Sequence, residues 1–137
     1  MAPRYPRAWV VAADTTVVVG RAFLGKPGDR GEARRMLKRL SGRSHRVVSG
    51  IALARAEGGF LRHRTAVTRV FFRALSAKDV LWYVGTDEPM DKAGAYGIQG
   101  KGGLLVERIE GSFSNVVGFP LEKFLELWRE AGNELPL

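Results

Sequence analysis

Residues 86–103 of this chain read TDEPMDKAGAYGIQGKGG, Thr86–Gly103. The segment combines charged and amide side chains with five glycines and contains few large apolar residues. Such a segment removes little apolar surface from water and so contributes little to a hydrophobic core. Its glycines and aspartates favour turns over long helices or strands. The chain must therefore build its core from other residues and use this segment for another purpose.

The length and composition favour one domain, residues 1–137, with a substantial core. The chain has 137 residues, of which 45% are hydrophobic, and this length suits one core better than two. It has no cysteine and two histidines, His45 and His63. Disulfides and thiolate metal sites are excluded, and two histidines are too few for a histidine cluster. Any metal ion would therefore bind to carboxylates.

No part of the sequence predicts a membrane span or secretion. No run approaches the roughly 18 to 20 apolar residues that a span needs. The first residues, MAPRYPRAWVVAAD, lack the long apolar core of a signal peptide. We therefore expect a cytoplasmic protein with no membrane partner.

Basic residues exceed acidic ones, with 22 Lys and Arg against 14 Asp and Glu and a formal net charge of +8. This charge favours nucleotides, nucleic acids or acidic surfaces as partners. Much of the excess lies in residues 29–46, where Ala33, Met36, Leu37 and Leu40 recur at helical spacing. The arginines between these residues then face solvent, and a solvated helix face is the simplest explanation for them.

The rest of the sequence predicts an α/β protein, a mixed sheet with flanking helices. The run WVVAA, Trp9–Ala13, is typical of a buried strand, and three valines continue it after Asp14 and Thr15. Cap residues and apolar spacing predict helices at 29–41, 76–85 and 120–131. Further strands are expected at 45–56, 65–75 and 104–111, the first two as an antiparallel pair around Gly58 and Gly59. Residues 60–64, FLRHR, fit either the strand or its loop.

Four polar clusters stand out: Asp14 with Thr15, Lys26 in GKP, residues 87–100, and GSFSNVVGFP at 111–120. Each has a simple structural explanation when it is taken alone. An aspartate at a strand end is commonly a cap or turn residue, a lysine is commonly solvated, and glycines commonly mark turns. Only their combination indicates a site.

In order and spacing, the segments AADTTVVV, LGKPGDRGEARRMLKRLSGRSHRVVSG and DEPMDKAGAYGIQGKGGLLVERIEGSFSNVVGFPL resemble the Maf family of nucleotide pyrophosphatases. The resemblance covers about residues 12–125. It implies a Maf/ITPase-like fold, with two lobes around a cleft. It also implies hydrolysis of a nucleoside triphosphate to the monophosphate and pyrophosphate, with a divalent metal ion, Mg²⁺ or Mn²⁺.

The family motif assigns roles to five residues of this chain. Asp14 is the catalytic carboxylate, which holds the metal or takes a proton from the attacking water. Lys26 and Lys92 spread the charge of the phosphates. Thr15 and Gln99 match the subgroup that resembles dTTP and UTP hydrolases, as opposed to the subgroup that favours methylated guanine nucleotides. An amide has both a donor and an acceptor for the pyrimidine edge.

Other residues of the motif keep two interpretations. Glu88 and Asp91 either contribute to the metal site and its surroundings or serve as a helix cap and a salt bridge with Lys92. The glycines at 94, 97 and 100 would let the backbone approach the ligand. Residues 111–118, GSFSNVVG, fit a structural or dimer-contact loop with a tight turn.

The departure from the family that matters most is at the start of the chain, and smaller ones occur at Asp87 and Phe119. Family members begin with a strand and an S-x-x-R-R type phosphate-binding motif, which Arg4 and Arg7 in PRYPR do not match. The fold is therefore expected to be truncated at its N-terminus, with an uncovered edge or apolar face around WVVAA that a homodimer would cover. Impaired hydrolysis would follow, and the alternative function is a non-catalytic nucleotide-binding or interaction domain. A nucleic-acid-binding protein has the least support, because no RNA-binding signature is present.

Overall fold

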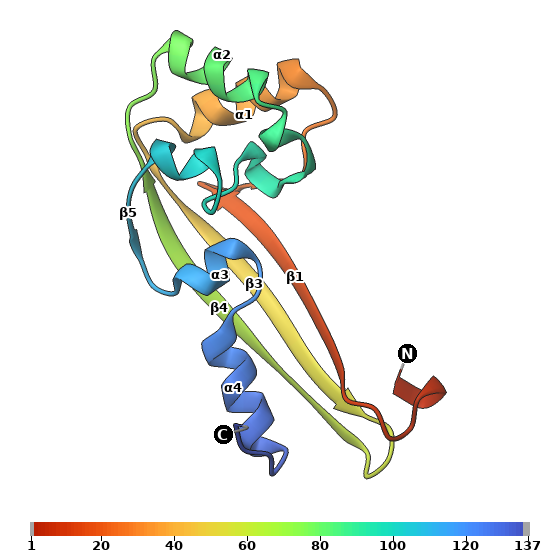
Figure 1. Cartoon of the computed structure of the whole chain (residues 1–137). Helices are drawn as coiled ribbons and strands as arrows, with labels where there is room; N and C mark the ends of the chain where they lie inside the picture. The colour runs from red at the N-terminus through yellow and green to blue at the C-terminus, as the bar shows by residue number, and fades with distance from the viewer. Residues whose placement is uncertain (1, 136–137) are drawn as a thin grey trace.

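The computed structural model describes residues 2–135 and is built on one long antiparallel sheet (Figure 1). Its strand order is β2-β1-β3-β4-β5, and all four pairings are antiparallel. The predicted α/β class with flanking helices is confirmed, but the strand directions in this sheet are not mixed. The strands are β1 Val10–Val19, β2 Ala22–Leu24, β3 Ser44–Arg55, β4 Phe60–Phe72 and β5 Val106–Glu110.

The β3–β4 hairpin forms the spine of the molecule. Its register runs from Ser44 opposite Phe71 to Arg55 opposite Phe60, so FLRHR belongs to β4 and not to the loop. Gly58 and Gly59 make the turn with φ of 87° and 67°, a region that favours glycine. The predicted antiparallel pair is confirmed. Both strands alternate buried and exposed residues along much of their length, as expected for strands with one covered face.

One lobe is a group of helices at the end of the sheet that carries β2 and β5 (Figure 1). Its helices are α1 Arg30–Leu40 and α2 Ala77–Gly85, with three short 3₁₀ helices, η2 Glu88–Asp91, η3 Ala93–Ala95 and η4 Lys101–Leu105. The predicted caps are present: Asp29 accepts from the backbone of Glu32, and Ser76 forms a capping box with Asp79. The core of this lobe includes Leu37, Leu40, Val70 and Tyr83.

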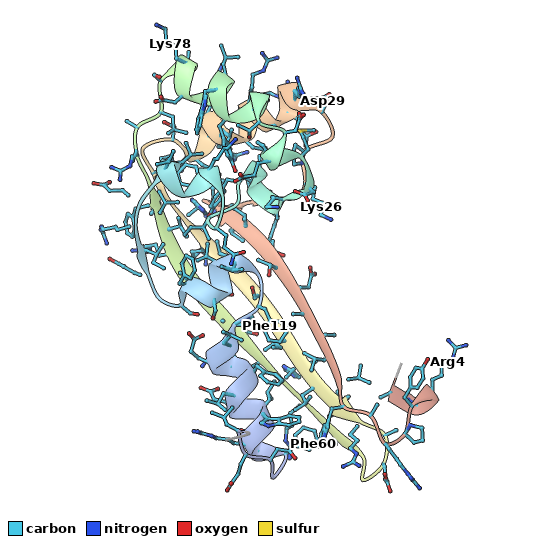
Figure 2. All side chains as sticks on the ribbon, viewed as in Figure 1. Arg4, Lys26, Asp29, Phe60, Lys78 and Phe119 are labelled. Carbon is cyan, nitrogen blue, oxygen red and sulfur yellow. The ribbon has the colours of Figure 1, made fainter. Side chains whose placement is uncertain are left out.

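The second lobe is formed where α3 Phe113–Val117 and α4 Leu121–Glu130 pack on β3 and β4. A smaller apolar cluster joins Leu127 of α4 to Ile51 and Leu53 of β3. Phe60 and Phe119 lie at its border (Figure 2). The helix η1 Ala2–Arg4 lies near this end of the sheet (Figure 1). The two predicted lobes are confirmed, and no helix within residues 2–135 is long and apolar enough to cross a membrane.

Strand β1 departs from the sequence prediction in its first half. It runs without interruption through Asp14, and Val11, Ala12 and Ala13 are exposed where a buried strand was expected. The reason is that the core of the first lobe reaches β1 only at Val17 and Val19, and β2 pairs only with Val17–Val19. Among the described residues, the outer edge of β1 from position 10 to position 16 has no partner strand. The expected uncovered edge around WVVAA is therefore present.

Gly94 joins the first lobe to β1. It has φ of 74° within η3, and a Cβ atom there would lie 3.0 Å from both γ-carbons of Val17. Its backbone N–H donates to the carbonyl of Gly25 at 3.1 Å. The absence of a side chain at this position thus allows close packing within the protein, a different role from the ligand contact that the sequence suggested.

We predict that Gly94→Ala lowers the free energy of unfolding by about 2 to 4 kcal/mol, because the positive φ and the overlap with Val17 both add cost. Gly20→Ala is the matched control, since Gly20 has φ of 57° but no atom within 4 Å of the added Cβ. It should cost only about 1 to 2 kcal/mol. Urea unfolding of the three proteins measures both losses, and equal losses would show that the contact with Val17 has no effect.

Candidate functional site

A cleft opens between the two lobes, where the Gly-rich segment faces α3. It consists of two adjoining hollows of about 340 and 370 Å³ that share Lys92, Tyr96, Gln99, Val116 and Val117. The 3₁₀ segments of the first lobe form one wall, and α3 forms the other. The predicted cleft is therefore present, and residues 88, 91–93 and 96–100 line it.

Two lysines reach the same hollow from different elements. Lys26 lies in the loop between β2 and α1, where Figure 2 shows its side chain at the edge of the first lobe. Lys92 lies between η2 and η3, and its Nζ is 3.0 Å from a carboxylate oxygen of Asp91. Asp91 lines the hollow as well. The arrangement suits an anion that carries several charges, because one carboxylate and two ammonium groups leave a net positive charge.

Thr15 and Gln99 lie in the same hollow as the lysines. The Thr15 hydroxyl is 2.8 Å from the Ser49 hydroxyl and 3.3 Å from the carbonyl oxygen of Gly118. The Gln99 side chain is exposed and makes no hydrogen bond with any other residue in the range 2–135. Four of the five predicted site residues are thus brought together.

Asp14 is the residue that the structure does not bring to this cleft. Successive side chains of a strand point to opposite faces, so Asp14 and Thr15 lie on different faces of β1. Asp14 is exposed and lines a separate hollow of about 280 Å³ with Gly50, His63 and Thr65. It borders the free edge of β1, so it is open to solvent although it is outside the cleft.

Comparisons with known proteins show the family to which the chain belongs. A family model described as Maf-like protein matches residues 1–131. This chain belongs to the Maf-like family. The resemblance seen in the sequence is therefore confirmed.

Several relatives of this Maf-like chain have the name dTTP/UTP pyrophosphatase. The relative from Myxococcus xanthus is 56% identical over 136 residues, which are 99% of this chain and 68% of that protein. The relative from Symbiobacterium thermophilum is 51% identical, over 94% of this chain and 66% of that protein. The relative from Syntrophus aciditrophicus is 45% identical, over 97% and 65%. The Maf-like chain spans about two thirds of the length of these relatives.

The segment GSFSNVVG has a larger role in the Maf-like cleft than the sequence suggested. It forms the helix α3, and Ser112 caps it by accepting from the backbone of Asn115. Asn115 is fully buried and donates to the Val47 carbonyl at 3.0 Å and to the Thr68 hydroxyl at 2.9 Å. These bonds fix the wall made by Val116 and Val117. The spacing of Ser112 and Asn115 is the signal that could have predicted the cap.

The ring of Tyr96 lines the cleft and is held from behind by His45. The Tyr96 hydroxyl is 2.7 Å from His45 Nε2, and both side chains are buried. His45 Nδ1 has no partner among the described residues. Burial lowers the pKa of His45 from 6.5 to about 4. The imidazole is therefore neutral at pH 7 in the folded protein.

We predict that this histidine makes the protein less stable in mild acid. Between pH 6.5 and pH 4 the unfolded chain binds a proton at His45 that the folded chain does not bind, so the free energy of unfolding falls as the pH falls. The difference in this free energy between wild type and His45→Gln should decrease by roughly 2 kcal/mol from pH 7 to pH 5. Urea unfolding at both pH values measures it, with exposed His63→Gln as the control. The same pH dependence in all three proteins would contradict the prediction.

Proposed function

We propose that this chain hydrolyses dTTP and UTP to the nucleoside monophosphate and pyrophosphate. The observation that carries the proposal is the gathering of Lys26, Lys92, Thr15 and Gln99 in one cleft of a Maf-like chain. The names of the relatives give the substrates. In this reaction water attacks the α-phosphorus, and the oxygen between the α- and β-phosphorus leaves with pyrophosphate.

The phosphates bind beside Lys26 and Lys92. Their ammonium groups oppose the charge that accumulates on the leaving pyrophosphate in the transition state. The Asp91 carboxylate cancels only part of the positive charge of the two ammonium groups. Both lysine side chains are flexible, so their ammonium groups act as point charges that adjust to the position of the phosphates.

The metal ion, Mg²⁺ or Mn²⁺, fits this cleft as a companion of the substrate. No group of three or more Asp, Glu or His side chains within residues 2–135 is close enough to form a metal cage. Mg²⁺ commonly binds through one or two carboxylates together with substrate phosphates, and Asp91 provides one such carboxylate in the cleft. When bound, the ion neutralises charge on the phosphates.

The base binds at Thr15 and Gln99. The Gln99 amide offers a donor to the pyrimidine O4 and an acceptor to its N3–H. The Thr15 hydroxyl already has Ser49 and Gly118 as partners. If Thr15 donates to Gly118 and accepts from Ser49, one acceptor position remains for a ligand, since a hydroxyl can accept twice. A uracil or thymine edge suits the Gln99 amide, whereas cytosine and adenine, which have an amino donor where these bases have O4 and an acceptor where they have N3–H, do not.

The family motif supports Asp14 as the base for the attacking water, but the Asp14 side chain lies on the face of β1 away from the cleft that holds Lys26 and Lys92. Its position on the free edge of β1, next to Thr15 in the chain, leaves the carboxylate accessible to water. Asp91 is the competing carboxylate, because it lines the cleft itself. A comparison of the two aspartates therefore decides between the motif and the geometry.

We predict that Asp14→Asn lowers kcat for dTTP by about 100-fold or more while KM changes little, because the amide keeps the shape but cannot take the proton. Asp91→Asn should instead raise the Mg²⁺ concentration needed for half-maximal rate, with kcat at saturating Mg²⁺ within about threefold of wild type. Steady-state assays that quantify pyrophosphate and orthophosphate separately test both variants.

Three outcomes of these assays would contradict parts of the proposal. Orthophosphate as the first product would exclude the pyrophosphatase reaction. Loss of kcat in Asp91→Asn but not in Asp14→Asn would transfer the role of base to Asp91. Binding of nucleotide without any turnover in the wild type would favour the non-catalytic nucleotide-binding domain.

We also propose that the protein is a cytoplasmic homodimer that covers the free edge of β1. Residues 10–16 present unpaired backbone groups there, and this edge carries no lysine or proline to block pairing.

We predict that wild type sediments as a dimer and that Ala12→Lys sediments as a monomer, because a charge on the edge opposes strand pairing. Leu81→Lys, which changes an exposed side chain on α2, is the control. A wild-type monomer in sedimentation velocity would exclude the dimer.

A further inference from the structure

The loop that carries Gln99 is held at both ends by one connected, partly buried hydrogen-bond system. At its start, the backbone N–H of Gly97 donates to the Tyr83 hydroxyl at 2.9 Å. At its end, the N–H groups of Lys101 and Gly102 donate to the two carboxylate oxygens of Glu88, each at 3.0 Å. The Tyr83 hydroxyl donates to Glu88 at 2.7 Å and so links the two ends. Gln99 lies at the middle of the loop, between the two anchored ends.

The packing around Glu88 leaves this loop little freedom. A Cβ atom at Gly100 would overlap the Glu88 carboxylate, and one at Gly97 would lie 2.6 Å from Cε of Lys92. Tyr83 is fully buried in the first lobe, where it belongs to the main apolar cluster. The backbone therefore follows the surface of Tyr83 and Glu88 closely, and a shift of either side chain moves the loop.

The charge state of the two side chains suits this role. Burial raises the pKa of Glu88, but hydrogen bonds from Tyr83, Gly102 and Lys101 outweigh it and lower the pKa overall. Burial raises the pKa of Tyr83 well above 10.0. An ionised carboxylate thus accepts three hydrogen bonds at pH 7, and a protonated hydroxyl donates one of them.

We propose that Tyr83 and Glu88 are positioning residues that set base selectivity by fixing the loop of Gln99. This inference rests on the proposed function and adds two specificity-determining residues that act without contact with the base. Glu88 borders the cleft, but its two oxygens already accept three hydrogen bonds, which are the contacts of an anchor. Selectivity depends on them because a base edge is discriminated only when its hydrogen-bonding partner is held in place.

The test compares Tyr83→Phe, Glu88→Gln and Gln99→Ala with wild type. Tyr83→Phe removes the hydroxyl that holds Gly97, and Glu88→Gln puts an amide where two backbone donors need acceptors. The ratio of kcat/KM for dTTP to kcat/KM for dCTP should fall about tenfold in each variant, and kcat for dTTP should stay within about threefold of wild type in Tyr83→Phe and Glu88→Gln. Glu107→Gln is the matched control for charge, since Glu107 is exposed on β5.

A double variant separates positioning from a general structural effect. Once the loop is free, loss of Gln99 should cost little more selectivity, so Tyr83→Phe with Gln99→Ala should match the single variants. Independent losses of selectivity that multiply would overturn the proposal. Amide hydrogen exchange gives a second measurement: Gly97 should exchange faster in Tyr83→Phe, and Lys101 and Gly102 in Glu88→Gln. Unchanged exchange would also overturn it, and Glu88→Gln serves if Tyr83→Phe fails to fold.

Two further results separate this inference from the proposed function. Selectivity is also measured as the ratio of Kd for deoxycytidine monophosphate to Kd for thymidine monophosphate. A wild type that binds selectively without hydrolysis rejects the pyrophosphatase, while the Kd ratios of the variants still test the anchor. A wild type without selectivity in either assay overturns both. An increase of more than about tenfold in the Mg²⁺ requirement of Glu88→Gln would make Glu88 a metal ligand and overturn its positioning role.

Discussion

The register between β1 and β3 is the constraint on which the cleft depends. Thr15 lies opposite Ser49, and Asp14 lies opposite Gly50. A shift of one residue would exchange the two faces of β1, and Asp14 would then enter the cleft in place of Thr15. The buried residues Val17 and Val19 oppose this shift, because it would move them away from the core of the first lobe. Hydrophobic packing at one end of the strand thus determines which polar side chain faces the cleft at the middle.

The sequence predicted local structure well because local signals decide it. Asp29 and Ser76 begin their helices through hydrogen bonds that span three residues, and paired glycines mark the hairpin turn. The uncovered edge around Val11 was also expected from the sequence, on the resemblance to the Maf family. The position of α3 on the sheet was not predictable, because Asn115 is held by Val47 and Thr68, which are distant in the sequence.

The candidate site was predictable as a set of residues but not as an arrangement. The spacing of the motif identified Lys26, Lys92, Thr15 and Gln99, and these residues meet in the cleft. The adjacency of Asp14 and Thr15 in the sequence suggested a shared site, yet strand alternation separates them. The sequence left the role of Glu88 open for a different reason. Its hydrogen-bond partners at 83, 101 and 102 lie in separate segments that become neighbours only in the folded structure.

Polar contacts fix α3, the wall of the cleft opposite the Gln99 loop. Val116 packs against the core of the first lobe, whereas Phe119 borders the cluster beneath α4, so α3 joins the two lobes. Apolar packing alone would allow α3 to slide along the sheet, because dispersion contacts have little direction. The bonds of Asn115 to one carbonyl and one hydroxyl have a direction, and burial makes their loss costly. The cleft keeps its width because hydrogen bonds, and not apolar packing, set the position of each wall.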